Sequence, residues 1–130
     1  MKWVVIAVRT LVGLGFTITG LDGFLHFLTI PPPPEGTPAA TFMGLLASSK
    51  YIYAVKVCEL LGGLMLLSGR MAPLGITLLM PVAVNILLYE LFLLKQPGPG
   101  YVLVPLLAFL IWGYRRYFAP VFTTSAEVTT

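Results

Sequence analysis

Residues 56–93 read KVCELLGGLMLLSGRMAPLGITLLMPVAVNILLYELFL and contain two long apolar runs with a short break between them. The break includes Gly69, and glycine is favoured just past the C-terminus of a helix. Pro73 follows, and proline suits the first turn of a new helix. The stretch therefore predicts two apolar helices, over about residues 51–68 and 73–94, joined by a tight turn.

The rest of the chain adds two more apolar runs, over about residues 3–30 and 101–118. The first ends at four consecutive prolines, residues 31–34, which cannot continue a helix. This run is longer than the apolar core of a signal peptide, and we interpret it as a retained first helix. The last run follows the turn-forming sequence KQPGPG at residues 95–100. A shorter apolar segment, about residues 38–49, predicts a helix on the membrane interface or capping the bundle.

The composition is strongly apolar, with 58% hydrophobic residues, 10% charged residues and a mean hydropathy of +0.93. A soluble domain of 130 residues would carry more charge. We therefore predict an all-α integral membrane four-helix bundle. It would form one domain over residues 1–122, with a Pro-rich loop and a short interfacial helix between helices 1 and 2, and a disordered tail over residues 123–130. The single cysteine, Cys58, excludes an internal disulfide.

The distribution of basic residues predicts the orientation in the membrane. Four spans place both termini on one side. That side would carry Lys2, Arg70, Arg115 and Arg116, and the opposite side Lys50 and Lys95. The positive-inside rule then predicts a multi-pass protein of the cell inner membrane with cytoplasmic termini. Arg9 lies toward the inner end and is expected to extend to the interface. The basic residues form no cluster with interleaved aromatic residues, so nucleic acid is not an expected partner.

Six polar residues interrupt the apolar runs and are the candidate ligand-binding residues: Asp22, His26, Lys56, Glu59, Asn85 and Glu90. A charge at the middle of a membrane helix costs about 2.5–3.5 kcal/mol on insertion scales. We therefore expect these side chains to face one another inside the bundle. Asp22, His26 and Glu59 are the candidate catalytic residues, because a carboxyl or imidazole can exchange a proton with a substrate.

The depths of these residues along their helices predict two layers near the outer leaflet, counting ~1.5 Å of rise per residue. The deeper layer holds Asp22, Glu59 and Asn85, and the shallower layer holds His26, Lys56 and Glu90. Four of them, Asp22, His26, Lys56 and Glu59, are predicted to form one connected cluster. Lys56 and Glu59 are three residues apart and share a helix face. Asn85 and Glu90 fit less well, because five residues rotate by about 140° on an ideal helix.

Three of these polar residues also have an alternative interpretation. Lys56 and Glu90 could extend to the outer interface. Asn85 could join neighbouring helices through a hydrogen bond.

Three carboxylates beside one lysine would leave an excess of negative charge in the cluster. Three arrangements relieve it: a protonated carboxyl at neutral pH, a charged His26, or a cation bound by Asp22, His26, Glu59 and Glu90. We favour a protonated carboxyl and expect no metal site.

Three short patterns in the chain are distinctive: Glu-x-x-Gly-Gly-x-x-Leu-Leu, Gly-Arg before the third helix, and Pro-x-x-x-Asn-Ile. The residues that carry them are Glu59, Gly62, Gly63, Gly69, Arg70, Pro81, Asn85 and Ile86. Together they resemble the DoxX family of small bacterial four-helix membrane proteins, over roughly residues 5–110. Many members of that family carry His where Glu90 stands and Asn where Asp22 stands, so the present site is more acidic.

The resemblance implies a redox-linked membrane subunit associated with a quinone or a sulfur compound, and quinone is the cofactor class that it suggests. The chain has no Cys-x-x-Cys pair and no second histidine to accompany His26, so it carries no thiol-exchange or bis-histidine haem motif of its own. Two alternatives stay open: a non-catalytic accessory subunit of a larger membrane complex, and a small-molecule or lipid-binding membrane protein. The expected partners are the lipid bilayer and either other membrane subunits or a second copy of the chain.

Overall fold

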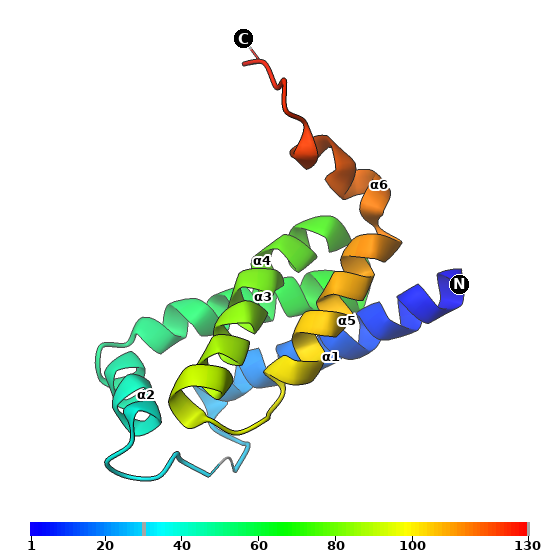
Figure 1. Cartoon of the computed structure of the whole chain (residues 1–130). Coiled ribbons are helices and arrows are strands. Elements are labelled where there is room, and N and C mark those ends of the chain that lie inside the picture. The colour runs from blue at the N-terminus through cyan, green and yellow to red at the C-terminus, as the bar shows by residue number, and fades with distance from the viewer. Residues whose placement is uncertain (30, 130) are drawn as a thin grey trace.

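The computed structural model describes residues 1–29 and 31–129, and every regular element within them is a helix. The described residues form six α-helices, a π-helix η1 and a 3-10 helix η2; Figure 1 shows how the α-helices are arranged. Their bounds are α1 Lys2–Leu25, α2 Pro38–Ser48, α3 Tyr51–Ser68, α4 Ala72–Leu88, η1 Tyr89–Leu94, α5 Gly100–Gly113, α6 Arg115–Phe118 and η2 Ala119–Phe122. The predicted all-α class is confirmed.

Three helical segments are long and apolar enough to cross a membrane. They are Lys2–Leu25, Tyr51–Ser68 and the continuous segment Ala72–Leu94, with hydropathies of 1.9, 1.5 and 2.0. A fourth qualifies only if α5 and the following segment Arg115–Phe122 count as one span, and these two are bent by 84° relative to each other. The described residues therefore offer three or four spans by length and composition.

The first helix ends earlier than the predicted range of residues 3–30. α1 stops at Leu25, because His26 takes a left-handed conformation (φ 53°, ψ 47°) and its N–H donates to the Asp22 carbonyl oxygen at 2.8 Å. The Asp22 side chain reinforces this end, since its Oδ1 accepts the Leu28 N–H at 2.7 Å. Aspartate often competes with helical hydrogen bonds in this way. Ile30, the predicted last residue, lies outside the described residues.

The last helix also differs from its predicted range of residues 101–118. α5 stops at Gly113, because Tyr114 leaves the helical conformation (φ −110°, ψ 23°) and α6 continues in another direction. Figure 1 shows the C-terminal segment projecting away from the other helices. Residues 123–129, in the predicted tail, contain no regular helix, and Thr130 lies outside the described residues.

The predicted short helix between the first two spans is confirmed as α2. Residues at its N-terminus determine where it starts, because Thr37 Oγ1 accepts the Ala40 N–H at 3.3 Å and Pro38 occupies the first turn. Ala39 is fully buried, and α2 contacts α3 and η1. The helix thus covers one end of the molecule (Figure 1).

Small residues bring α1 and α3 into backbone contact. A Cβ atom at Gly63 would lie 2.6 Å from the Thr17 nitrogen, and one at Gly20 would lie 2.8 Å from the Leu60 nitrogen. α3 also packs on α4, α4 on α5, and α5 on α1, so the four long helices close a ring around one core. The fully buried core residues include Leu66, Ile76, Leu79, Leu107 and Leu110.

Candidate functional site

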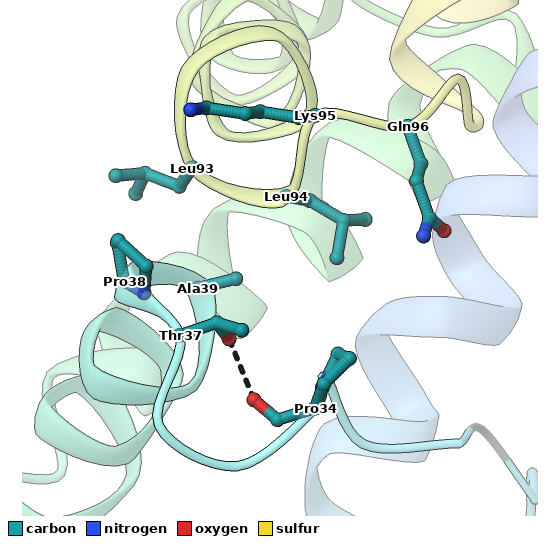
Figure 2. A pocket seen from close by; sticks show the side chains of 8 residues that line it. All are labelled: Pro34, Thr37, Pro38, Ala39, Leu93, Leu94, Lys95 and Gln96. Carbon is teal, nitrogen blue, oxygen red and sulfur yellow. Dashed lines mark hydrogen bonds between the residues drawn. The ribbon is translucent and has the colours of Figure 1, made fainter.

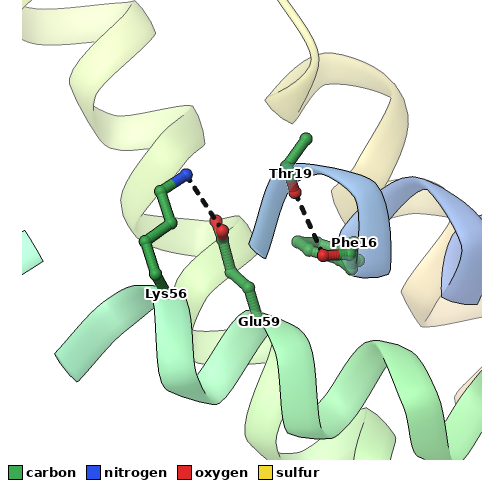
Figure 3. A network of polar contacts seen from close by, with 4 residues as sticks. All are labelled: Phe16, Thr19, Lys56 and Glu59. Atoms are coloured by element: carbon green, nitrogen blue, oxygen red, sulfur yellow. Dashed lines mark hydrogen bonds and ion pairs between the residues drawn. The ribbon is translucent and has the colours of Figure 1, made fainter. Parts of the chain in front are cut away.

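The central polar contact is an ion pair between Lys56 and Glu59 on α3. Lys56 Nζ lies 3.0 Å from Glu59 Oε2, and the two side chains are 20% and 5% exposed. Glu59 Oε2 has no further hydrogen-bond partner in the described residues. Thr19 of α1 lies beside this carboxylate, with its hydroxyl donating to the Phe16 carbonyl oxygen at 3.2 Å (Figure 3). The predicted pairing of Lys56 with Glu59 is confirmed.

The last turn of α1 holds the lysine stem in place. A Cβ atom at Gly23 would overlap the Lys56 side chain, so the lysine methylenes lie directly on the α1 backbone. Next to this contact, the rings of Phe24 on α1 and Tyr53 on α3 stack with centroids 5.5 Å apart. The ion pair therefore sits in the seam between α1 and α3, where Lys56 is partly covered.

The predicted cluster of four residues is wrong for Asp22 and His26, which do not join Lys56 and Glu59. Asp22 is half-buried and accepts the Leu28 N–H, and His26 is exposed at the end of α1. Among residues 1–29 and 31–129, no hydrogen bond or ion pair joins either of them to Lys56 or Glu59. The physical reason is the early end of α1: His26 is not helical, so it does not share a helix face with Asp22.

Asn85 and Glu90, on α4 and η1, do not form the two predicted layers with the other polar residues either. Asn85 is exposed on α4, and its Nδ2 donates to the Pro81 carbonyl oxygen at 2.9 Å. Glu90 is buried, only 3% exposed, and its Oε1 accepts the Gly100 N–H at 2.8 Å. Glu90 therefore does not extend to the interface. It attaches the turn before α5 to η1, and glycine at position 98 leaves room for the carboxylate.

The carboxylates of the three predicted segments are thus used in three separate places. Asp22 bonds to Leu28, Glu59 pairs with Lys56, and Glu90 bonds to Gly100. In the described part of the chain, no three His, Cys, Asp or Glu side chains gather in a way that could hold a metal ion. The cation-bound arrangement of Asp22, His26, Glu59 and Glu90 is therefore not formed, and the excess of negative charge does not arise at one point.

A cavity of about 320 Å³ lies between the start of α2 and the end of η1 (Figure 2). Its polar side chains are Thr37, Lys95 and Gln96, and the Thr37 hydroxyl donates to the Pro34 carbonyl oxygen at 2.6 Å. None of the six predicted site residues lines it. Most of its wall is the proline-rich connection and the end of η1, so it is separate from the ion pair.

The Glu-x-x-Gly-Gly pattern has a clear packing role. A Cβ atom at Gly62 would lie 2.6 Å from Leu79 Cγ of α4, whereas one at Gly63 would meet the Thr17 backbone of α1. Two adjacent glycines thus let α3 approach a different helix on each side, one turn after Glu59. No protein-family model, curated protein or solved structure matches the chain. Membership of the DoxX family stays a prediction from these motifs.

Proposed function

We propose that the chain is a DoxX-like integral membrane protein of the cell inner membrane, in which α1, α3, α4 with η1, and α5 form a four-helix transmembrane bundle. The proposal is supported by large apolar side chains that stay exposed on these helices, such as Leu61, Leu64 and Phe92 at 48%, 46% and 68%. Such side chains are favourable against lipid. α5 alone rises only about 21 Å, so the fourth span would include the bend at Tyr114 or a locally thinner bilayer.

The proposed orientation has both termini in the cytoplasm and α2 outside. It can be tested with single cysteines in a Cys58→Ala background. We expect Glu35→Cys to react with a membrane-impermeant maleimide in cells whose outer membrane alone is permeabilised. Ser125→Cys should react only after the inner membrane is also opened. Labelling of Ser125→Cys from the periplasm would contradict this orientation.

The function that we propose is that of a redox-linked membrane subunit that binds a quinone or another small redox compound at the Lys56–Glu59 pair. The observation that carries the proposal is the ion pair itself: it is largely buried at a helix seam, yet Lys56 keeps 20% exposure and Glu59 Oε2 has no other partner. The lysine ammonium can donate to a carbonyl oxygen of the ligand, and the carboxyl can exchange a proton with it.

The chain would supply binding and proton exchange, while electrons would come from a partner redox protein. The resemblance to DoxX proteins supports the same class of function. Quinone is the ligand class to test first.

Quinone content of the purified chain tests this proposal. After mild solubilisation from native membranes, we expect the wild-type protein to retain quinone in near-stoichiometric amount, measured by solvent extraction and chromatography. Glu59→Gln should retain about tenfold less, because a hydrogen bond to a charged group contributes about 1.5–3 kcal/mol. Glu90→Gln is the matched control, since it changes another buried carboxyl away from the ion pair, and should retain the quinone. Equal quinone in all three proteins, or none in the wild type, would contradict the proposal.

An accessory role in a larger complex is the second candidate, and Asn85 favours it. This amide is exposed on a span-length apolar helix, bonded only to the Pro81 carbonyl within the described chain. Polar side chains on membrane helices commonly form hydrogen bonds to a neighbouring helix. A stoichiometric partner subunit without bound quinone in the same purification would support this second candidate.

A further inference from the structure

A second cavity, of about 360 Å³, lies at the opposite end of α1 from the ion pair. It is lined by Lys2, Val5, Ile6, Arg9, Gly113 and Tyr114. The four residues from α1 are spaced as one helix face, and the other two come from the end of α5. The cavity is therefore a wedge between the first and last long helices.

The shape of this wedge follows from the end of α5. A Cβ atom at Gly113 would lie 2.8 Å from Val5 Cγ1, so α5 and α1 touch at that point. At the next residue, Tyr114, the chain leaves the helix and the following segment bends by 84°. The bend directs α6 away, and the face of Lys2, Ile6 and Arg9 is only partly covered.

The Arg9 side chain lies inside this wedge. Its Nη1 donates to Tyr114 Oη at 3.2 Å, and a Cβ atom at Gly69 would lie 3.0 Å from its Cζ. Its Nε is shielded from solvent and has no hydrogen-bond partner. In the described chain, Arg9 forms no ion pair within 4.0 Å; Lys56 and Glu59 form the one observed. A permanent positive charge is thus partly buried without a counter-ion.

We propose that this cavity binds a phosphate group, with Arg9 as the main ligand and Lys2 as a second cation. A guanidinium presents a planar fork of N–H donors that matches two phosphate oxygens, and a single bond to Tyr114 leaves several donors free. An anion would also compensate the buried charge, which is unfavourable when unpaired. The volume lies within the roughly 300–1,000 Å³ of small-molecule sites. The phosphate can belong to an anionic phospholipid or be free in solution.

Thermal unfolding of the full chain in an uncharged detergent tests the proposal. Three probes are added in separate titrations: phosphatidylglycerol, a galactosyl diacylglycerol that has no phosphate, and inorganic phosphate. We expect phosphatidylglycerol to raise the Tm of the wild type, and the galactolipid to raise it much less. Arg9→Gln should weaken the midpoint of the phosphatidylglycerol titration about tenfold or more, as the loss of a charged hydrogen bond predicts.

Arg116→Gln is the matched control, because Arg116 is an exposed arginine two residues after Tyr114 and outside the cavity. It should respond to phosphatidylglycerol as the wild type does. If inorganic phosphate also stabilises the wild type and not Arg9→Gln, the free anion is a source as well, and the site is supported. Equal responses of wild type and Arg9→Gln, or an equal response to the galactolipid, would overturn the proposal.

A conservative variant keeps the test decisive if Arg9→Gln does not fold. Arg9→Lys retains the charge and loses the fork, so we expect its phosphatidylglycerol midpoint to be several-fold weaker. A midpoint equal to that of the wild type would reject the proposed binding mode. Glu59→Gln should respond as the wild type does, because the ion pair lies at the other end of α1. Failure of the quinone proposal and failure of the phosphate site are therefore distinguishable.

Discussion

Gly63→Ala is expected to lower the free energy of unfolding by about 1–3 kcal/mol or more, the usual range for overpacking. The added Cβ would lie 2.6 Å from the Thr17 nitrogen and 3.0 Å from the Gly13 carbonyl oxygen. Both neighbours are backbone atoms of α1, so no side chain can rotate out of the way and the helices must separate. Separation would also disturb the seam that holds Lys56 and Glu59.

The matched control for this prediction is Gly15→Ala, a glycine in α1 whose added Cβ would meet no atom within 4 Å. There the substitution should stabilise the protein by up to about 1 kcal/mol, because alanine has the higher helix propensity. Unfolding in mixed micelles, with an increasing fraction of a denaturing detergent, measures both variants under the same conditions. Equal effects of the two substitutions would show that α1 and α3 are not in backbone contact.

Lys56→Met is expected to be the second strongly destabilising change, at about 3–5 kcal/mol. It leaves the Glu59 carboxylate, only 5% exposed, without its cationic partner. Glu59→Leu should cost less, since Lys56 is 20% exposed and its long side chain can extend toward the interface. The double variant Lys56→Met/Glu59→Leu should be more stable than Lys56→Met alone, because it removes both charges together.

A double-mutant cycle over these three variants measures the coupling between the two residues. Lys50→Met, at an exposed lysine just before α3, is the control and should change stability by no more than about 0.5 kcal/mol. If the double variant were as unstable as the sum of the single ones, Lys56 and Glu59 would not be energetically coupled. The ion pair of Lys56 and Glu59 would then not support the proposed ligand-binding site.

Local signals in the sequence determined the class of fold and several helix boundaries. The predicted segment 51–68 is α3 as observed, Tyr51–Ser68, because Gly69 adopts the left-handed conformation (φ 79°) that commonly ends a helix. The start of α2 was equally predictable, since a threonine cap and a following proline act within a few residues. The pairing of Lys56 with Glu59 belongs here too, because three residues on a helix fix a shared face.

Hydropathy alone does not mark the ends of α1 and α5. Residues 26–29 extend the apolar run of α1 in the sequence. In the structure, however, His26 adopts φ 53° and ends the helix, and the Asp22 side chain bonds to Leu28 instead of facing the bundle. His26 is therefore not in the predicted shallower layer with Lys56 and Glu90, because it lies beyond the end of α1. A hydropathy pattern reports which residues avoid water, and it contains no information on such a side-chain-to-backbone bond.

The sequence by itself determined an all-α chain with apolar helices of membrane-spanning length, because composition and helix-ending residues act locally. Only the tertiary structure decided which polar groups meet. Glu90 bonds to Gly100 because the intervening turn folds back, and Arg9 meets Tyr114 across 105 positions of the chain. Such contacts depend on the relative rotation and closeness of helices, which Gly63 and Gly113 set by the absence of a side chain. The phosphate site proposed at Arg9 could be recognised only once those helices were placed.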